Sequence, residues 1–477
     1  MLRCGGLVLA AATLSAAIAG CRPPAPAPSV LLVVVDTLRA DRVGALATGP
    51  GGLGQGSAGR TPGIDRWARG AVGFRRAVTP APFTMPAMAS MLTGAWPDRT
   101  GVDRHEPGTS LGPWKGTTLA EAARRAGLAT SAVVANPWLV RARTGFDRGF
   151  DRFERLYRPG SPPGSNSAQA VTDAAIRELD RAGDGRFFLW VHYFDPHMPY
   201  EPPPEFAREA GAAPGPSRVM RDFDAPGRDL ARLYAGEGYD AAELEGARRL
   251  YDGEVLYVDH EVARLLHHLA AKGLDRRTVV VVASDHGEAL GEHGLFFAHD
   301  YTVYDELVRV ALLVKAPGLA AGIRDDEASL VDVAPTLCRL ASLGCDASFD
   351  GRDLLGPDRS PRTLFAATTP LRDKGTPFAG LTVPGPAGRW TMALGDGRKL
   401  VRIPAPSGAS LRLYDLATDP SESHGREATS SEAGRELARS LEQWSKAMDA
   451  ARPASAGAHA RHRRRDEATL RSLGYLQ

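Results

Sequence analysis

Runs of β-branched residues that lead directly into acidic or histidine side chains constrain the fold of this chain most. Residues 30–35 (VLLVVV) are followed by Asp36, and residues 279–283 (VVVVA) lead through one serine into Asp285 and His286. Continuous apolar runs of this length are typical of strands that are buried on both faces of a parallel sheet. The sequence therefore predicts such a sheet, with polar side chains where its strands end.

Further strands and helices alternate along the chain. Strands are expected at 129–135, 187–192 and 310–314, and helices at 86–92, 117–126 and 240–272. This alternation predicts an α/β fold with a mostly parallel central sheet and helices on both faces. Residues 44–60 are rich in glycine and lack periodicity, so we expect a mobile loop there.

The pattern changes after about residue 366. Short strands separated by turn residues are expected at 381–383, 390–394, 399–403 and 411–414. They predict a small antiparallel sheet, and a helix is expected after it at 431–449.

Four polar side chains follow the predicted parallel strands. They are Asp36, His192, Asp285 and His286. Because ligands bind outside the carboxyl ends of the strands in open α/β sheets, these groups are expected at one rim. A carboxylate beside an imidazole suits Zn²⁺ or Mn²⁺ better than an all-oxygen Ca²⁺ site. Alone, Asp36, Asp285 and His286 each read as a cap or a surface histidine; together, at the ends of the two strongest strands, they predict a metal site.

Composition excludes several classes of protein. The chain has 477 residues, of which 24% are charged and 43% hydrophobic, so it is neither a mini-protein nor a disordered chain. This length predicts two or three domains, or one large α/β domain with an appendage. A formal net charge of only +2 gives no reason to expect nucleic acid binding. The four cysteines form no CxxC pair, which excludes a disulfide-dense scaffold and a cysteine-rich zinc site.

The N-terminus resembles a bacterial lipoprotein signal. Residues 1–20 combine a short basic start with an apolar run, and small residues directly precede Cys21. The resemblance implies cleavage before Cys21 and acylation of that residue; the alternative is an ordinary secretory signal with Cys21 incidental. Residues 21–29 are expected to form a Pro/Ala tether. We therefore expect a protein of the cell envelope, lipid-anchored outside the cytoplasm at the periplasmic face or in an outer membrane.

A series of ordered motifs resembles the sulfatase family of the alkaline phosphatase superfamily. The motifs are 30–44 (VLLVVVDTLRADRVG), 61–68 (TPGIDRWA), 91–94 (MLTG), 195–200 (DPHMPY), 251–259 (YDGEVLYVD), 284–294 (SDHGEALGEHG), 304–310 (YDELVRV), 330–337 (LVDVAPTL) and 413–420 (LYDLATDP). The resemblance implies an alkaline-phosphatase-like α/β/α sandwich with a small C-terminal antiparallel sheet and helix. It also implies one divalent metal ion and a covalent intermediate on a metal-bound nucleophile. We expect a catalytic domain at 30–365, a C-terminal subdomain at 366–450 and a basic tail at 451–477.

The chain departs from this family where the nucleophile is expected. Sulfatases carry a Cys or Ser that is oxidised to formylglycine, followed two positions later by Pro and then by Ser and Arg. Here the segment begins with Thr84, which cannot form that aldehyde, and continues through Pro86 to Ala87 and Met88. In the turn where the family places Lys and His, the chain has Asn136 followed by Pro and Trp.

Two further departures concern the metal ligands. Thr37 replaces the second acidic residue of the family's first pair, and His286 replaces the usual Asn beside the later aspartate. Relatives that transfer phosphoryl groups use a Thr or Ser alkoxide with Asp and His ligands. The resemblance therefore implies Thr84 as both nucleophile and ligand. The expected metal ligands are Asp36, Thr84, Asp285 and His286, with Zn or Mn favoured and Ca possible.

Other histidines and acids are assigned from the same motifs. His197 matches the family histidine that binds the ester and protonates the leaving group, and His299 falls near its substrate-binding Lys. His192 reads as a buried strand-end residue, and His293 as a structural residue of its turn. Acids of the 240–272 helix, which are Asp252, Glu254 and Asp259, read as a structural or solvated face.

Three functions are compatible with the sequence. The favoured one is metal-dependent hydrolysis or transfer of a phosphate ester through Thr84. The alternatives are a sulfuric ester hydrolase without formylglycine and a non-catalytic surface lipoprotein that keeps the fold. The substrate is expected to be a small-molecule, glycan or lipid ester, and the insert at 201–247 is expected to form the rim of its pocket.

Two of the four cysteines are expected in the folded domain. Cys4 lies in the predicted signal and Cys21 is the predicted lipid anchor, which leaves Cys338 and Cys345, seven residues apart. Outside the reducing cytosol such a pair can form one local disulfide.

Overall fold

The computed structural model describes residues 27–47, 60–103, 109–140, 144–157, 167–225, 228–345, 349–369, 388–405 and 407–453. The predicted signal with Cys21, the strand at 381–383, the basic tail after residue 453 and most of the predicted loop at 44–60 lie outside these residues. In the described part of the chain, no helix has both the length and the apolar character needed to cross a membrane.

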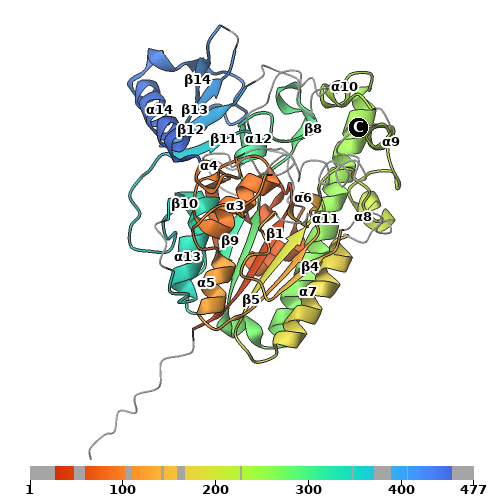
Figure 1. The fold of residues 1–477 in the computed structure, drawn as a ribbon. Coiled ribbons are helices and arrows are strands. Elements are labelled where there is room, and N and C mark those ends of the chain that lie inside the picture. Colours follow the sequence, from red (N-terminus) through yellow and green to blue (C-terminus); the bar gives the residue numbers. More distant parts are fainter. Residues whose placement is uncertain are drawn as a thin grey trace, which may run out of the picture.

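An eight-stranded sheet forms the centre of the molecule (Figure 1). In spatial order its strands are β10 (Gly322–Ser329), β2 (Val72–Val78), β9 (Leu312–Lys315), β6 (Thr278–Ser284), β1 (Ser29–Val35), β5 (Phe187–Tyr193), β3 (Ala129–Val134) and β4 (Arg152–Arg155). Neighbouring strands are parallel except at β9, which runs antiparallel to β2 and β6. The predicted mostly parallel sheet is confirmed.

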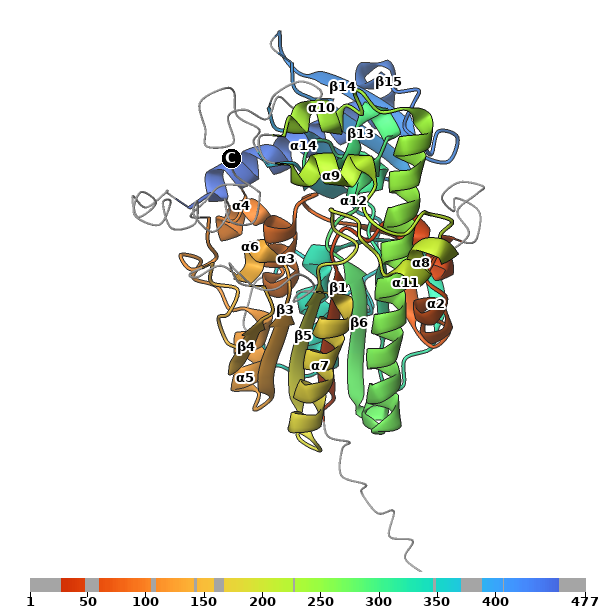
Figure 2. The same cartoon turned by 90° about the vertical axis from the view of Figure 1, so that its right-hand side faces the viewer.

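Helices cover both faces of this sheet. Helices α7 (Ala168–Ala182) and α11 (Ala241–Ala271) lie across one face, as Figure 2 shows. The other face carries α3 (Thr84–Thr93), α5 (Leu119–Arg125) and α13 (Val333–Leu340). Capping boxes start two of these helices, because Thr118 and Glu121 satisfy the first N–H groups of α5, and Asp240 and Glu243 those of α11.

Alternate side chains of each strand point to opposite faces of the sheet and pack in two separate cores. In β1, Val30, Leu32 and Val34 pack in the core shared with α3, α5 and α13, whereas Leu31 and Val33 pack in the core shared with α7 and α11. Because successive side chains of a strand point to opposite faces, a strand buried on both faces must be apolar throughout. This explains the continuous runs in the sequence.

The remaining short elements connect the strands. They are η1 (Ala40–Arg42), α1 (Gly44–Ala47), α2 (Pro62–Ala68), α4 (Pro97–Thr100), α6 (Pro137–Val140), α8 (Pro204–Glu209), α9 (Arg218–Asp224), α10 (Leu230–Tyr234), η2 (Leu274–Arg277), β7 (Ala289–Leu290), η3 (Glu292–Gly294), β8 (Phe296–Ala298), α12 (Asp305–Val308) and η4 (Leu330–Asp332). The prediction of a loop from residue 44 was wrong for Gly44–Ala47, which form one helical turn held by hydrogen bonds to Val43 and Asp65.

A second, antiparallel sheet forms the C-terminal part (blue in Figure 1). Its strands are β11 (Leu364–Ala367), β12 (Thr391–Gly395), β13 (Arg398–Ile403), β14 (Ser410–Asp415) and β15 (Arg426–Glu427), followed by η5 (Ala428–Ser430) and α14 (Glu432–Ala451). Leu437, Leu441 and Trp444 of α14 pack against this sheet. The predicted small C-terminal antiparallel sheet is confirmed.

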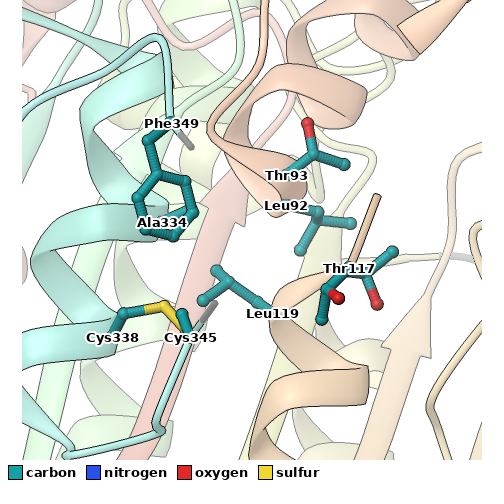
Figure 3. Close-up of a pocket in the computed structure, with 9 residues that line it drawn as sticks. Leu92, Thr93, Thr117, Leu119, Ala334, Cys338, Cys345 and Phe349 are labelled. Atoms are coloured by element: carbon teal, nitrogen blue, oxygen red, sulfur yellow. A yellow bond between two sulfur atoms is a disulfide. The ribbon is translucent and has the colours of Figure 1, made fainter. Parts of the chain in front are cut away.

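A disulfide joins Cys338 and Cys345 across the end of α13. Figure 3 shows it beside Phe349 and Leu119, where a small, mainly apolar pocket lies between α13, α5 and the end of α3. Thr93 lines this pocket, whereas Thr84 lies at the other end of α3, about 14 Å away for a helix of this length. The pocket is therefore separate from the strand-end residues described below.

Candidate metal and catalytic site

Four polar side chains extend one face of the central sheet beyond its apolar core. In each of the strands β1, β3, β5 and β6, apolar side chains at every second position point toward α3. When this alternation is continued to the carboxyl end of each strand, the next side chains on that face are those of Asp36, Asn136, His192 and Asp285. The strands are parallel, so their carboxyl ends lie together. All four side chains are fully buried. Parity and register together therefore bring them to one place beneath the N-terminus of α3.

Each carboxylate has one oxygen held by the protein and one oxygen without a partner. Asp36 Oδ2 accepts a hydrogen bond from Asn136 Nδ2. Asp285 Oδ1 accepts from the backbone N–H groups of Thr37, at 3.2 Å, and His286, at 2.8 Å. Among the described residues, Asp36 Oδ1 and Asp285 Oδ2 are buried without a hydrogen-bond partner. Such orphaned oxygens are costly unless a cation or a proton occupies the space between them.

Burial and charge set the protonation of this carboxylate pair. Burial and the neighbouring Asp285 raise the pKa of Asp36 well above its usual value. Burial also acts against ionisation of Asp285, but His286 and His192 outweigh it and lower the pKa of Asp285 to about 2. The negative charge on Asp285 thus opposes ionisation of Asp36, and a cation bound between the two carboxylates would remove that repulsion.

His286 presents one ring nitrogen to both carboxylates. Its Nδ1 lies 2.9 Å from the backbone oxygen of Gly287, so Nδ1 carries the proton and Nε2 is the acceptor. His286 Nε2 lies 3.6 Å from Asp36 Oδ1 and 3.6 Å from Asp285 Oδ2. Burial lowers the pKa of His286, which favours the neutral form that a metal ligand must have.

Thr84 is the first residue of α3 and its hydroxyl faces this group. Thr84 Oγ1 lies 3.2 Å from His286 Nε2 and accepts a hydrogen bond of 3.3 Å from Asn136 Nδ2. The side chain is 1% exposed. The start of a helix adds partial positive charge where an anion would bind. Ala87 and Met88, at the Ser and Arg positions of the sulfatase motif, are buried in the apolar core instead.

The donor set fits a divalent metal ion. Asp36, His192 and Asp285 offer ligand atoms that all lie within 4.8 Å of one another. The predicted ligands Asp36, Thr84, Asp285 and His286 are joined by the contacts given above. Mixed carboxylate and imidazole donors of this kind are typical of Zn²⁺ and other first-row metals.

Two more histidines lie next to this cluster. The ring of His299 lies 4.5 Å from the ring of His286 and 5.1 Å from that of His197, measured between centroids. His299 Nδ1 lies 3.1 Å from Glu288 Oε1, and Tyr200 donates to the other oxygen of Glu288 at 3.2 Å. The structure therefore places His299 beside His286 and His197 beside His299, and Glu288 and Tyr200 contact His299 directly or through Glu288.

His197 is neutral in this arrangement. Burial, with the neighbouring His299, lowers the pKa of His197 to about 3. Its Nδ1 lies 2.7 Å from the backbone oxygen of Met198, so the Nδ1 proton is donated there. Burial likewise raises the pKa of Glu288 to about 7.

The other motif residues have structural roles. His293 stacks on Tyr304 with ring centroids 3.7 Å apart. Asp259 accepts hydrogen bonds from the N–H groups of Gly63, at 2.8 Å, and Ile64, at 2.7 Å, and so caps α2. The idea of a solvated face on α11 was wrong for Glu254 and Asp259, which are each 3% exposed, because α11 packs between α2, α7 and α8.

Sequence reasoning missed part of this site. His192 is expected from the sequence at the same rim as Asp36 and Asp285 but not among the metal ligands, although it continues the series Phe188, Trp190 that faces α3. Asn136 was noted as the loss of a cation, but not as a donor to both Asp36 and Thr84. Both residues could have been found by continuing the alternation of side chains along the predicted strands. The sequence gives no comparable indication of Glu288 or Tyr200, because these residues are 88 positions apart and come into contact only in the folded structure.

Comparison with known proteins identifies the family of this chain. The sulfatase family model matches residues 28–343. An ulvan-active sulfatase of Formosa agariphila is 27% identical over 325 residues, which cover 62% of this chain and 59% of that protein. A multifunctional alkaline phosphatase superfamily protein of Trinickia caryophylli is 26% identical over 401 residues, covering 69% of this chain and 76% of that protein.

A solved structure shares the fold. The phosphonate monoester hydrolase of Agrobacterium radiobacter superposes with a TM-score of 0.67 at 20% identity, covering 89% of this chain and 96% of the other. The chain spans about three fifths of the length of the ulvan-active sulfatase, at 59%. The family model covers more than half of the chain, and its range includes the strands and helices that build the site. The chain belongs to the sulfatase family.

Proposed function

We propose that this protein is a metal-dependent hydrolase of phosphate esters, with Thr84 as its nucleophile. The observation that carries the proposal is the Thr84 hydroxyl, at the start of α3, within 3.2 Å of His286 Nε2 and beside two orphaned carboxylate oxygens. A threonine hydroxyl cannot become formylglycine, so a direct attack by oxygen is the chemistry that this side chain offers.

The proposed ligands are Asp36, Asp285, His286 and Thr84. When bound, a divalent cation lowers the pKa of the Thr84 hydroxyl and offsets negative charge on the non-bridging oxygens of the ester. The Asn136 amide orients Thr84 Oγ1 through a hydrogen bond of 3.3 Å. The backbone N–H groups at the start of α3, where Thr84 lies, would also favour the bound anion.

The proposed reaction proceeds in two steps. Thr84 Oγ forms a bond to phosphorus as the bond from phosphorus to the leaving oxygen breaks. The proton lost from Thr84 is balanced by the proton that the departing alcohol gains, for which His299, beside Glu288, is the proposed donor. Neutral His197, whose Nδ1 proton is held by the Met198 carbonyl, would help to bind the ester. Water then attacks the phosphothreonine ester, releasing phosphate and restoring the Thr84 hydroxyl.

The experiment compares three substrates and two variants. The purified protein is assayed with added Zn²⁺ or Mn²⁺ on p-nitrophenyl phosphate, bis(p-nitrophenyl) phosphate and p-nitrophenyl sulfate. We expect kcat/KM for one of the phosphate esters to exceed that for the sulfate by at least about tenfold. Thr84→Ala is expected to lose about three orders of magnitude or more, and Thr84→Ser to keep most of the activity, since it keeps the nucleophilic oxygen. Phosphothreonine at position 84 is expected in acid-quenched protein.

Sulfate ester hydrolysis without formylglycine is the second candidate. The name of the ulvan-active sulfatase favours it, because that relative matches 62% of the chain. A higher kcat/KM for p-nitrophenyl sulfate would contradict the phosphoester preference and support this candidate. Identical behaviour of wild type and Thr84→Ala with every substrate would contradict both, and would favour a non-catalytic lipoprotein that keeps the fold.

The remaining proposals concern location and substrate. We propose that the protein is lipid-anchored at Cys21 in the cell envelope and acts on a small-molecule, glycan or lipid ester. Metabolic labelling with a fatty acid analogue, in wild type and Cys21→Ala, tests the anchor. Unlabelled wild-type protein would contradict it.

A further inference from the structure

We infer that His192 is a ligand of the metal ion in this site, which makes the centre selective for a nitrogen-preferring first-row metal such as Zn²⁺ over Ca²⁺. The inference rests on the proposed metal-dependent function and specifies its metal centre. The key observation is a fully buried imidazole beside two orphaned carboxylate oxygens.

The fold fixes where His192 points. His192 pairs in register with Val34 of β1 and Val134 of β3, both of which face α3. Paired side chains of parallel strands lie on the same face of the sheet, so His192 also points toward α3. Along the strands His192 lies two residues before Asp36 and Asn136, and its Nε2 reaches to 3.7 Å from Asp285 Oδ2.

The hydrogen bonds of His192 are incomplete. Neither Nδ1 nor Nε2 has a hydrogen-bond partner in the described structure, although the side chain is 0% exposed. His192 Nε2 lies 3.7 Å from Asp285 Oδ2, which is too far for a hydrogen bond. Trp190 packs edge-on against the ring with centroids 6.1 Å apart and supplies no acceptor. A histidine that merely filled the core would be expected to satisfy at least one nitrogen.

The spacing of the donors suits one shared ion. Two ligand atoms that each lie about 2.1 Å from a zinc ion are at most about 4.2 Å apart. The distance of 3.7 Å from His192 Nε2 to Asp285 Oδ2 falls within this limit. So do the distances of 3.6 Å from His286 Nε2 to each carboxylate. The other oxygen of each carboxylate is already occupied by a protein donor, so the orphaned oxygens are the ones that face the histidines.

The donor chemistry sets the preference between metals. Ca²⁺ binds oxygen ligands almost exclusively, and six to eight of them. Here two imidazole nitrogens accompany two carboxylates, and the position after Asp36 is Thr37 rather than a third acid. Two nitrogens and few oxygens favour Zn²⁺ and neighbouring first-row ions. His192 thus supplies, from the adjacent strand, a donor that Thr37 does not.

The test measures metal binding rather than turnover. Zinc-loaded wild-type protein is examined by X-ray absorption, which counts imidazole ligands, and we expect two. Dissociation constants for Zn²⁺ and Ca²⁺ are then measured for wild type, His192→Phe, His192→Asp and the control His424→Ala, whose side chain is 87% exposed. We expect His192→Phe to weaken zinc binding by at least about tenfold, since even loss of an outer-shell partner costs 10–100-fold. His192→Asp replaces nitrogen by oxygen and is expected to shift the ratio of zinc to calcium affinity toward calcium, and His424→Ala to change neither.

The outcomes separate this inference from the proposed function. One imidazole in the wild-type spectrum, or unchanged zinc affinity in folded His192→Phe, would overturn the role of His192 and leave a metal-dependent enzyme intact. Wild-type protein that binds no zinc at up to millimolar concentration would overturn both. If His192→Phe does not fold, the ligand count in wild type and the affinity ratio in His192→Asp still decide the question.

Discussion

At the scale of single residues, Asn136 shows how one side chain can organise a nucleophile. Its Oδ1 accepts a hydrogen bond of 2.7 Å from the Trp138 N–H, which fixes the orientation of the amide. Nδ2 must then point toward Asp36 and Thr84, and it donates to both. Asn136 therefore couples the proposed nucleophile to a proposed metal ligand without carrying charge itself.

Removing this amide tests its role. We expect Asn136→Ala to lower kcat/KM for an aryl phosphate by about two orders of magnitude, as loss of one aligned donor typically does. Thr93→Ala is the matched control. It deletes a buried hydroxyl from the other end of α3, where Thr93 bonds only within the helix and its C-terminal turn. We expect that variant to keep its kcat/KM. Equal losses in the two variants would mean that Asn136 serves stability alone, and thermal unfolding of both proteins checks this.

Site residues could be predicted from the sequence where they directly follow a recognisable strand. Asp36, Asp285 and His286 follow strands that are evident from the sequence, and the fold brings them within hydrogen-bonding or ion-pair distance of one another. Glu288 could not be assigned, because its contact with His299 depends on the turn between β7 and β8. Side-chain neighbours that are separated by an irregular turn have no periodic signal in the sequence.

At the scale of elements, the turn after β6 requires glycine at position 287. A Cβ atom at Gly287 would lie 2.0 Å from the backbone oxygen of Glu306, which belongs to α12. The N–H of Gly287 also donates to the backbone oxygen of Leu307 at 2.9 Å. The turn that carries Asp285 and His286 thus packs directly on the backbone of α12, with no room for a side chain.

Gly287→Ala is expected to displace this turn. Because the conflict is with backbone atoms, relief requires movement of Asp285 and His286, and we expect loss of bound metal and a lower unfolding temperature. Gly246→Ala offers the control, since Gly246 lies inside α11 and a Cβ there meets nothing within 4 Å. That substitution should leave metal content unchanged and raise stability by up to about 1 kcal/mol. Metal analysis and thermal unfolding distinguish the two variants, and normal metal content in Gly287→Ala would contradict the argument.

Two features of the central sheet, the strand β10 and the direction of β9, were not predicted from the sequence. β10 (Gly322–Ser329) is an edge strand whose sequence, GIRDDEAS, is mostly polar because most of it remains accessible to water. β9 was expected as a strand, but its antiparallel direction was not, since direction depends on the path of the connection and not on composition. Strands buried on both faces are readable from their apolar runs; edges and directions are not.

At the scale of the whole molecule, buried charges join the two sheets. Lys399 of β13 lies 2.8 Å from Asp305 of α12 and 2.9 Å from Glu422. Glu422 also accepts from the backbone N–H of Asp305. Lys399 is 0% exposed, so this network holds the C-terminal sheet against the segment that supports Gly287. The C-terminal part of the molecule therefore contacts α12, on which the turn with Asp285 and His286 packs.

Glu306, which neighbours this network, makes the stability of the molecule depend on pH. Burial, together with Glu422 and Glu292, raises the pKa of Glu306 to about 8, and Arg39 only partly opposes this. His293, 4.0 Å away, has a pKa that burial and Lys399 lower, so it provides no positive charge at neutral pH. A carboxyl group with a raised pKa in the folded state binds its proton more tightly there than in the unfolded chain. Its contribution to stability is full at or below about pH 4 and is lost as the pH rises through about 8.

Glu306→Gln should remove this pH dependence, because the amide stays neutral at every pH. We expect the unfolding temperature of the variant to resemble that of wild type near pH 5 and to exceed it near pH 9, where the wild-type carboxylate is buried and ionised. Glu237→Gln, at an exposed position, serves as the control and should follow the wild-type profile. Thermal unfolding of the three proteins from pH 5 to pH 9 gives the comparison. If wild type and Glu306→Gln lose stability in parallel toward pH 9, the buried carboxyl at the junction of the two sheets is not the group that titrates.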